Sequence, residues 1–249
     1  MPDSIWTDWK FWSALIALVA LIKTELPPIN RLFKRRKFDL TIHDRIAITH
    51  TLGNPNVNML ISFRNTCDLS IVIKSIVISF NRGNEHNFSL SAREYFPSMM
   101  DEKKAIFTHV NLRPGEEWSH VVSFYDVFSR NDEDRYRQIC NAIQDNIGAK
   151  RRAPGFDKNS IAEVDQNLAD AATSFFWEKF KWERGEYTVK ITASTEQSSV
   201  NLSEYFRFTL FESDSNRLIN YCDGYKIGLG VCFFDQKQQQ PLSIPITPL

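Results

Sequence analysis

The chain has few residues whose types and spacing could support a reaction. Its 249 residues contain no GxSxG nucleophile elbow, no GxxxxGK phosphate loop, no HExxH zinc motif and no GxGxxG dinucleotide fingerprint. We therefore predict no catalytic, cofactor-binding or metal-binding residues, and we expect a protein that is not an enzyme and uses no cofactor. An enzyme whose site is dispersed along the chain is the alternative.

Two histidines could meet if the turn at Pro114 and Gly115 closed a β-hairpin. Such a tip would set His109 opposite His120, and two facing imidazoles can bind a metal ion. The simpler interpretation, which we prefer, is that both are ordinary strand side chains.

The four cysteines form no CxxC pair and lie far apart at Cys67, Cys140, Cys222 and Cys232. We expect buried or idle thiols, because widely spaced cysteines without a CxxC pair stay reduced in the cytoplasmic setting that we predict below. A disulfide between Cys222 and Cys232, across a strand pair, is the alternative.

Short runs of β-branched and aromatic residues, bounded by turn residues, dominate the chain after residue 37. Such runs are typical of a sandwich or barrel, and Pro114 with Gly115 marks one turn. The long run at 71–80 is interrupted near Lys74 and Ser75. The expected strands cover 38–42, 59–63, 71–80, 105–110, 118–125, 187–193, 205–211 and 225–234.

Two helices are expected between the early and the late strands. In residues 132–148 one apolar face repeats at helical spacing, and Lys150, Arg151 and Arg152 suit the C-terminal end of its dipole. A phosphate site at these three cations is the less favoured interpretation. The second helix is expected over 161–180, with Ser160 and Glu163 as a capping box.

An apolar run near the start of the chain predicts a membrane anchor. Residues 11–22 are interrupted only by Ser13, and extension back to Ile5 gives a helix of 18 residues. A helix lying in the membrane plane or buried in protein, and a cleaved signal peptide, are the alternatives. The predicted anchor residues are Trp6, Trp9, Phe11, Trp12, Leu15, Ile16, Leu18, Val19, Leu21 and Ile22.

The charge around this run predicts its orientation. Side chains of residues 1–22 carry a net charge of −1, those of residues 23–37 carry +5, and those of residues 38–249 carry −4. The positive-inside rule then places the N-terminus outside the inner (cell) membrane and the C-terminal domain in the cytoplasm. A mildly acidic body is not expected to bind nucleic acid. Lipid headgroup contacts are expected from Lys23, Arg31, Lys34, Arg35, Arg36 and Lys37. A nucleic-acid patch at residues 31–37 is the less favoured interpretation of this cluster.

The end of the second expected helix is rich in aromatic residues. Most of them should seal the helix onto the sheet, but Trp177 lies about 100° from Phe176 around a helix, so they cannot all face one core. Trp177 and Trp182 are therefore the candidate contacts with a protein partner, and we expect Trp177 to be the exposed one.

Together these features predict three parts: an anchor helix at 1–26, a basic neck at 27–37 and a β-sandwich domain at 38–249 with a helical insertion at about 131–182. The anchor, the neck, the runs MLISFRN and IVIKSIVISF and the turn LRPGEEW resemble a loose group of bacterial single-pass proteins. The resemblance implies an immunoglobulin-like β-sandwich in the cytoplasm, and some such proteins occur in phage-defence gene clusters.

We accordingly expect a membrane-anchored, non-catalytic interaction or scaffold protein that binds another protein. The alternative is an effector of anti-phage defence that forms a homo-oligomer and disturbs the membrane.

Overall fold

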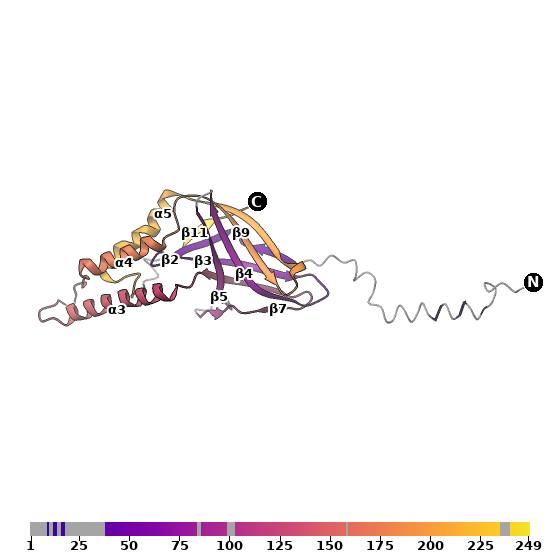
Figure 1. Ribbon diagram of the computed structural model, residues 1–249, viewed down its shortest axis with the longest axis horizontal. Helices are drawn as coiled ribbons and strands as arrows, with labels where there is room; N and C mark the ends of the chain where they lie inside the picture. The colour runs from indigo at the N-terminus through magenta and orange to yellow at the C-terminus, as the bar shows by residue number, and fades with distance from the viewer. Residues whose placement is uncertain are drawn as a thin grey trace, which may run out of the picture.

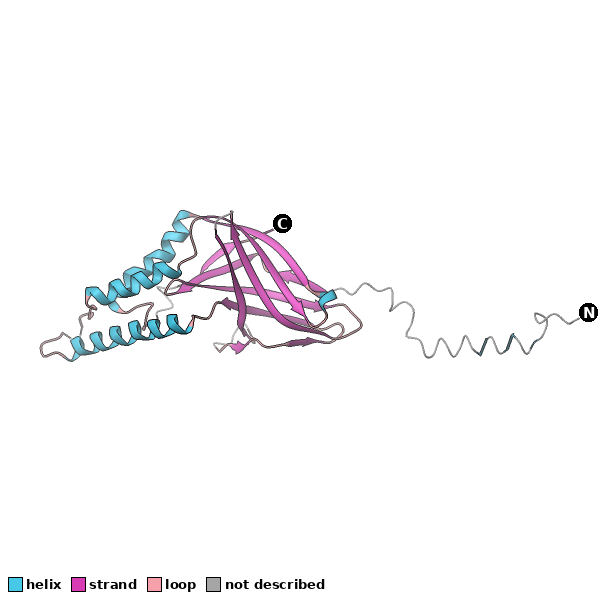
Figure 2. Ribbon diagram, viewed as in Figure 1, coloured by secondary structure: helices cyan, strands magenta, loops and turns pink. Residues whose placement is uncertain are grey.

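The computed structural model describes residues 9, 12, 13, 16, 17, 38–83, 86–98, 103–157, 159–234 and 240–249. Strands make up 43% of these described residues. A curved sheet forms the body, and helices extend from one end of it (Figures 1 and 2).

The strands belong to a single twelve-stranded sheet. Its order is β11 (Leu242–Pro245), β2 (Arg45–Thr51), β3 (Asn54–Asn65), β8 (Glu117–Tyr125), β5 (His86–Phe96), β4 (Ile71–Arg82), β9 (Gly185–Thr195), β10 (Leu202–Leu210) and β12 (Thr247–Pro248). Beside this path, β1 (Phe38–Ile42) pairs with β3, β6 (Ala105–Ile106) with β5, and β7 (Val110–Leu112) with β4.

The C-terminal segment brings the two ends of this sheet together. Only Ile246 separates β11 from β12, yet β11 pairs with β2 at one end and β12 pairs with β10 at the other. The result is one nearly closed sheet, so the predicted immunoglobulin-like β-sandwich is wrong. A sandwich needs two facing sheets, whereas these strands share one continuous network of pairing.

Alternation along the strands explains the core. In β3 the residues Val57, Met59, Ile61 and Phe63 are buried, and the residues between them face outward. The expected interruption near Lys74 is a register shift between Ile73 and Ser75.

The strand expected at 225–234 is wrong. Residues Asn220–Ile227 form a 3₁₀-helix, and Gly228 ends it with a φ of +76°. Strands β2 and β5, in turn, lie in stretches where no strand was expected.

The first expected helix is present as α3 (Arg130–Arg152), which buries Ile139, Ile143 and Ile147. The second begins later than expected, as α4 (Gln166–Lys179). Residues 161–165 are not helical, and the Val164 N–H donates to the Lys226 carbonyl at 2.7 Å. The predicted Ser160 capping box is therefore wrong. A shorter helix, α5 (Glu212–Ile219), follows β10.

The expected membrane anchor finds no support in the structure. Among the described residues, no helix combines the length and the apolar character needed to cross a bilayer. The transmembrane helix and the single-pass placement at the inner membrane are corrected accordingly. Trp9, Trp12 and Ile16 are described and exposed. The other predicted anchor residues and all of the predicted headgroup contacts lie outside the described residues.

Candidate functional site

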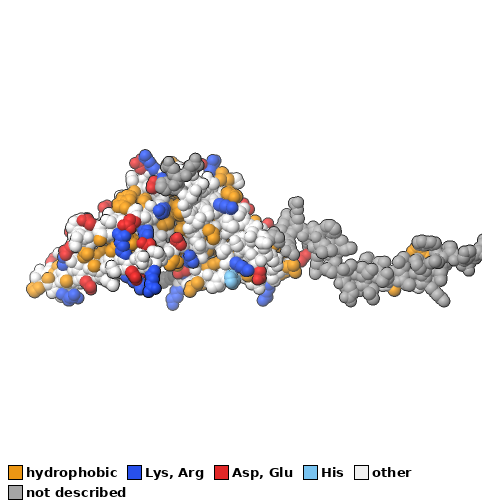
Figure 3. Space-filling view, viewed as in Figure 1, with side chains coloured by type: hydrophobic (Ala, Val, Ile, Leu, Met, Phe, Trp, Pro, Cys, Tyr) orange, Lys and Arg blue, Asp and Glu red, His pale blue; other side chains and the backbone are white. Residues whose placement is uncertain are grey.

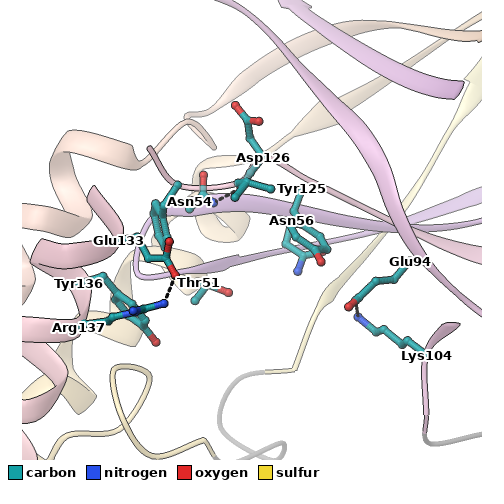
Figure 4. Close-up of a pocket in the computed structure, with 12 residues that line it drawn as sticks. Thr51, Asn54, Asn56, Glu94, Lys104, Tyr125, Asp126, Glu133, Tyr136 and Arg137 are labelled. Atoms are coloured by element: carbon teal, nitrogen blue, oxygen red, sulfur yellow. Dashed lines mark hydrogen bonds and ion pairs between the residues drawn. The ribbon is translucent and has the colours of Figure 1, made fainter. Parts of the chain in front are cut away.

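A groove of about 390 Å³ lies beside α3, where β3 begins and where β5 and β8 end (Figure 4). Val57 of β3 and Phe124 of β8 face the core, so their neighbours Asn56 and Tyr125 lie on the outer face of the sheet. The groove is therefore built on the outer face, with α3 as one wall and the segment before β6 as the other.

The floor of the groove holds a polar atom without a partner. Asn56 and Tyr125 lie directly opposite each other in the β3–β8 register. The Asn56 Oδ1 atom is buried, and no described group donates a hydrogen bond to it. In the neighbouring pair on the same face, Asn58 and Ser123, the equivalent oxygen does have a donor: the Ser123 hydroxyl donates to Asn58 Oδ1 at 2.6 Å. A buried acceptor without a donor is costly, so a donor from a bound group would stabilise this atom.

A β-bulge shapes the β5 side of the groove. The β5–β8 register shifts between Ala92 and Glu94, which changes the direction of the side chains at this point. The Glu94 carboxylate lies 3.5 Å from Lys104 Nζ, and the Arg93 guanidinium lies 4.0 Å from the Asp126 carboxylate. Burial, and then the negative charge of Glu94, raises the pKa of Tyr125. Tyr125 therefore stays protonated, and a hydrogen bond with Glu94 contributes to the raised pKa.

A hydrogen bond to the segment after the 3₁₀-helix at Asn220–Ile227 holds α3 in position at the groove. The Tyr136 hydroxyl donates to the Val231 carbonyl at 3.0 Å. On the same wall, Arg137 forms an ion pair with Glu133, one turn earlier. The start of β3 is joined to the segment that follows β8, because Asn54 Nδ2 donates to the Asp126 carbonyl at 2.8 Å.

Charge is balanced inside the groove. Each charged lining residue has a partner of opposite sign: Glu94 with Lys104, Asp126 with Arg93, and Glu133 with Arg137. A ligand with a charge of its own would have to compete with one of these pairs. The arrangement therefore favours an uncharged ligand that can donate a hydrogen bond to Asn56.

The surface of the two long helices is also charge-balanced. Figure 3 shows acidic and basic side chains interspersed over the helical part of the molecule. Arg135 lies 2.6 Å from Glu178, and Lys179 lies 2.7 Å from Asp132, so these pairs link α3 to α4.

The histidine pair considered from the sequence does not form. β7 pairs with β4, whereas β8 pairs with β3 and β5, so His109 and His120 do not face each other across a hairpin. His120 Nδ1 lies 3.0 Å from the Phe96 carbonyl oxygen, among aromatic rings. Within the described ranges, no group of three or more His, Cys, Asp or Glu residues could hold a metal ion.

The other sequence candidates lie apart from the groove. All four cysteines are free thiols. The Lys150 ammonium lies 2.6 Å from the Asp165 carboxylate and donates to the Glu163 carbonyl. A phosphate would have to compete with both partners for this ammonium.

The two candidate tryptophans differ in exposure. Trp182 is fully buried, and its indole N–H donates to the Thr49 carbonyl at 2.9 Å. Trp177 is 54% exposed, and its ring packs against Phe176 and Phe180. Of the two, only Trp177 is available to a partner, and it does not line the groove.

Sequence reasoning missed the groove, although one signal was present. Asn54, Asn56 and Asn58 alternate along one strand, which places three carboxamides on one face. Asparagine is depleted in strands, so three of them on one face indicate a polar role.

No protein-family model matches this chain, and no curated protein matches it. A solved structure of a protein from Archaeoglobus fulgidus is similar over 70% of this chain and 96% of that chain, at 8% sequence identity and a TM-score of 0.28. A likeness of this size supports no statement about fold or function.

Proposed function

We propose that this chain is a binding protein that holds an uncharged, extended segment of another protein in the groove beside α3. The observation that carries this proposal is the buried Asn56 Oδ1, which has no donor among the described residues, in a groove whose charged residues are already paired.

A polypeptide backbone supplies what the groove lacks. Every residue except proline carries a backbone N–H, which needs an acceptor when it is buried. Asn56 Oδ1 offers that acceptor, and the Asn54 and Tyr125 side chains lie close by on the same outer face. The volume of the groove, about 390 Å³, lies within the range of ligand-binding sites, roughly 300–1,000 Å³.

Electrostatics favour an uncharged segment. Glu94 and Lys104 are about two-thirds buried, with 32% and 30% of their side chains exposed. A charged ligand group that displaced either partner would leave the other one poorly solvated, which is unfavourable.

Selection from a phage-displayed library of random dodecapeptides on the full-length protein tests this proposal. Enriched peptides should contain few charged residues, and Asn56→Leu should weaken their binding about tenfold or more, because the acceptor is lost. The matched control is Asn111→Leu, on exposed Asn111 of β7, which should leave the affinity unchanged.

Circular dichroism of both variants separates lost binding from lost folding. If Asn56→Leu unfolds the protein, Asn56→Ser shortens the same side chain and takes its place. Failure to enrich any peptide, or equal binding by the Asn56 and Asn111 variants, would overturn the proposal.

A further inference from the structure

The outer face of β5, β4, β9 and β10 presents a regular grid of uncharged polar side chains. Strands β5, β4 and β9 are labelled in Figure 1. The register of the four strands places these residues directly opposite one another in three rows. Eight of the twelve positions are Ser, Thr or Asn. The rows are Ser91–Val77–Thr192–Ser203, Ser89–Ser79–Lys190–Tyr205 and Asn87–Asn81–Thr188–Arg207.

A hollow of about 480 Å³ lies on two of these rows. The Ser79 and Ser89 hydroxyls are 2.8 Å apart, and Asn81 and Asn87 are exposed beside them. Hydroxyls and carboxamides can both donate and accept, so the hollow presents a dense set of neutral hydrogen-bonding groups.

One positive charge stands at the edge of this hollow. Lys190 is the single charged residue among its described lining residues, and no described carboxylate forms an ion pair with it. Its ammonium lies over the Tyr205 ring, 5.5 Å from the centroid. In the adjacent row, by contrast, Arg207 is paired with Glu186 at 3.5 Å.

Tyr205 adds an apolar surface next to this charge. Its side chain is 47% exposed. An exposed aromatic ring beside hydrogen-bonding groups suits a ligand that has both an apolar face and polar edges.

We infer that this hollow binds an acidic oligosaccharide. The sugar hydroxyls would exchange hydrogen bonds with Ser79, Asn81 and Thr188, and a C–H face of a sugar ring would cover Tyr205. The carboxylate of a uronic acid unit would pair with Lys190, a charge-assisted contact stronger than a neutral hydrogen bond. This site is separate from the groove beside α3 and does not rest on the function proposed for it.

Two other ligand classes fit less well. A neutral sugar would leave Lys190 without a counter-charge. A nucleic acid strand carries a charge at each phosphate, whereas the hollow offers one uncompensated cation.

Calorimetric titration of the full-length protein with a tetrasaccharide that carries a single uronic acid unit, with maltotetraose and with a thymidine tetranucleotide tests the inference. The acidic tetrasaccharide should bind, and Lys190→Gln and Tyr205→Ala should each weaken it about tenfold. The matched control is Lys74→Gln, on the same strand as Ser79 but outside the hollow, which should leave the affinity unchanged.

The substituted side chains point outward, so the variants should keep the fold, as circular dichroism can verify. The inference fails if no saccharide binds, if maltotetraose binds as tightly as the acidic sugar, or if the tetranucleotide competes equally. It also fails if Lys74→Gln has the same effect as Lys190→Gln. Asn56→Leu should not alter saccharide binding, so failure of either proposal can be recognised separately.

Discussion

The imidazole Nε2 of His50 donates a hydrogen bond to the Leu218 carbonyl oxygen at 3.0 Å. Its Nδ1 accepts from the Gly53 N–H at 3.1 Å, which fixes the neutral tautomer with the proton on Nε2. The ring is enclosed by the aromatic rings of Phe176, Phe180 and Tyr221. His50 therefore joins β2, α4 and α5 at the helical end of the sheet.

This burial predicts a pH-dependent stability. Desolvation lowers the pKa of His50 to about 4, despite its hydrogen bond to Leu218. The unfolded chain binds the proton more tightly than the folded protein does. The contribution of His50 to the free energy of unfolding is therefore full above pH 6.5. It falls by roughly 3 kcal/mol in total as the pH drops from 6.5 toward 4.

Urea unfolding at several pH values measures this loss. His50→Gln should remove most of the slope between pH 6.5 and 4, whereas the exposed His109→Gln should retain it. An unchanged slope in His50→Gln would show that other groups cause the acid sensitivity.

The tryptophan pair gives a second prediction. Trp182→Phe removes the N–H that satisfies the Thr49 carbonyl and leaves a space in the core, so it should lower the free energy of unfolding by about 2–3 kcal/mol. Trp177→Phe changes an exposed side chain and should cost about 0.5 kcal/mol or less. Denaturation followed by circular dichroism compares them, and equal losses would contradict the burial difference.

Local patterns predicted single elements better than their arrangement. Helix α3 follows from one apolar face, because Ile139, Ile143 and Ile147 repeat at helical spacing and are all buried. The residue at which α4 begins was not predicted correctly from the local sequence pattern. The Ser160 hydroxyl donates to the Asp157 carboxylate at 3.3 Å instead of capping a helix, so a local turn replaced the predicted cap.

The sheet shows where such patterns stop being informative. Alternation marks a strand but does not specify its partner, and β11 pairs Leu242 with Ile48, far away in the sequence. Strand β12 has only two residues, one of them Pro248, and carries no periodic signal. The groove depends on three strands that are not consecutive along the chain, so its residues could be proposed one by one but not as a site.

The C-terminal segment that closes the sheet leads to a third prediction. Ile244 is 6% exposed and lies opposite Ile46. Ile244→Ala should cost about 2–4 kcal/mol and loosen the contacts of β11 and β12 with β2 and β10. Hydrogen exchange should therefore accelerate most in residues 45–51 and 202–210, while the central strands β4 and β9 keep their protection.

Thr247→Ala is the matched control, because Thr247 is exposed in the same segment. It should change neither stability nor exchange measurably. Uniform acceleration across all strands in Ile244→Ala would mean that the segment does not close the sheet as a separate unit.

The turn between β2 and β3 carries the last prediction. Leu52 and Gly53 both have positive φ, at 48° and 87°, which is the conformation of a tight hairpin turn. A Cβ at Gly53 would collide with the Phe176 carbonyl oxygen at the end of α4. Gly83 also has a positive φ, at 61°, but no described atom lies within 4 Å of the position that its Cβ would take.

Comparison of alanine substitutions at the two glycines therefore separates the cost of backbone strain from the cost of the steric collision. Gly83→Ala should lower the free energy of unfolding by about 1 kcal/mol, the cost of the left-handed conformation alone. Gly53→Ala should add a collision of about 1–3 kcal/mol and push α4 away from the turn, which also weakens the Gly53 N–H bond to His50. Urea unfolding of both variants measures the difference, and equal losses would show that α4 does not pack on this turn.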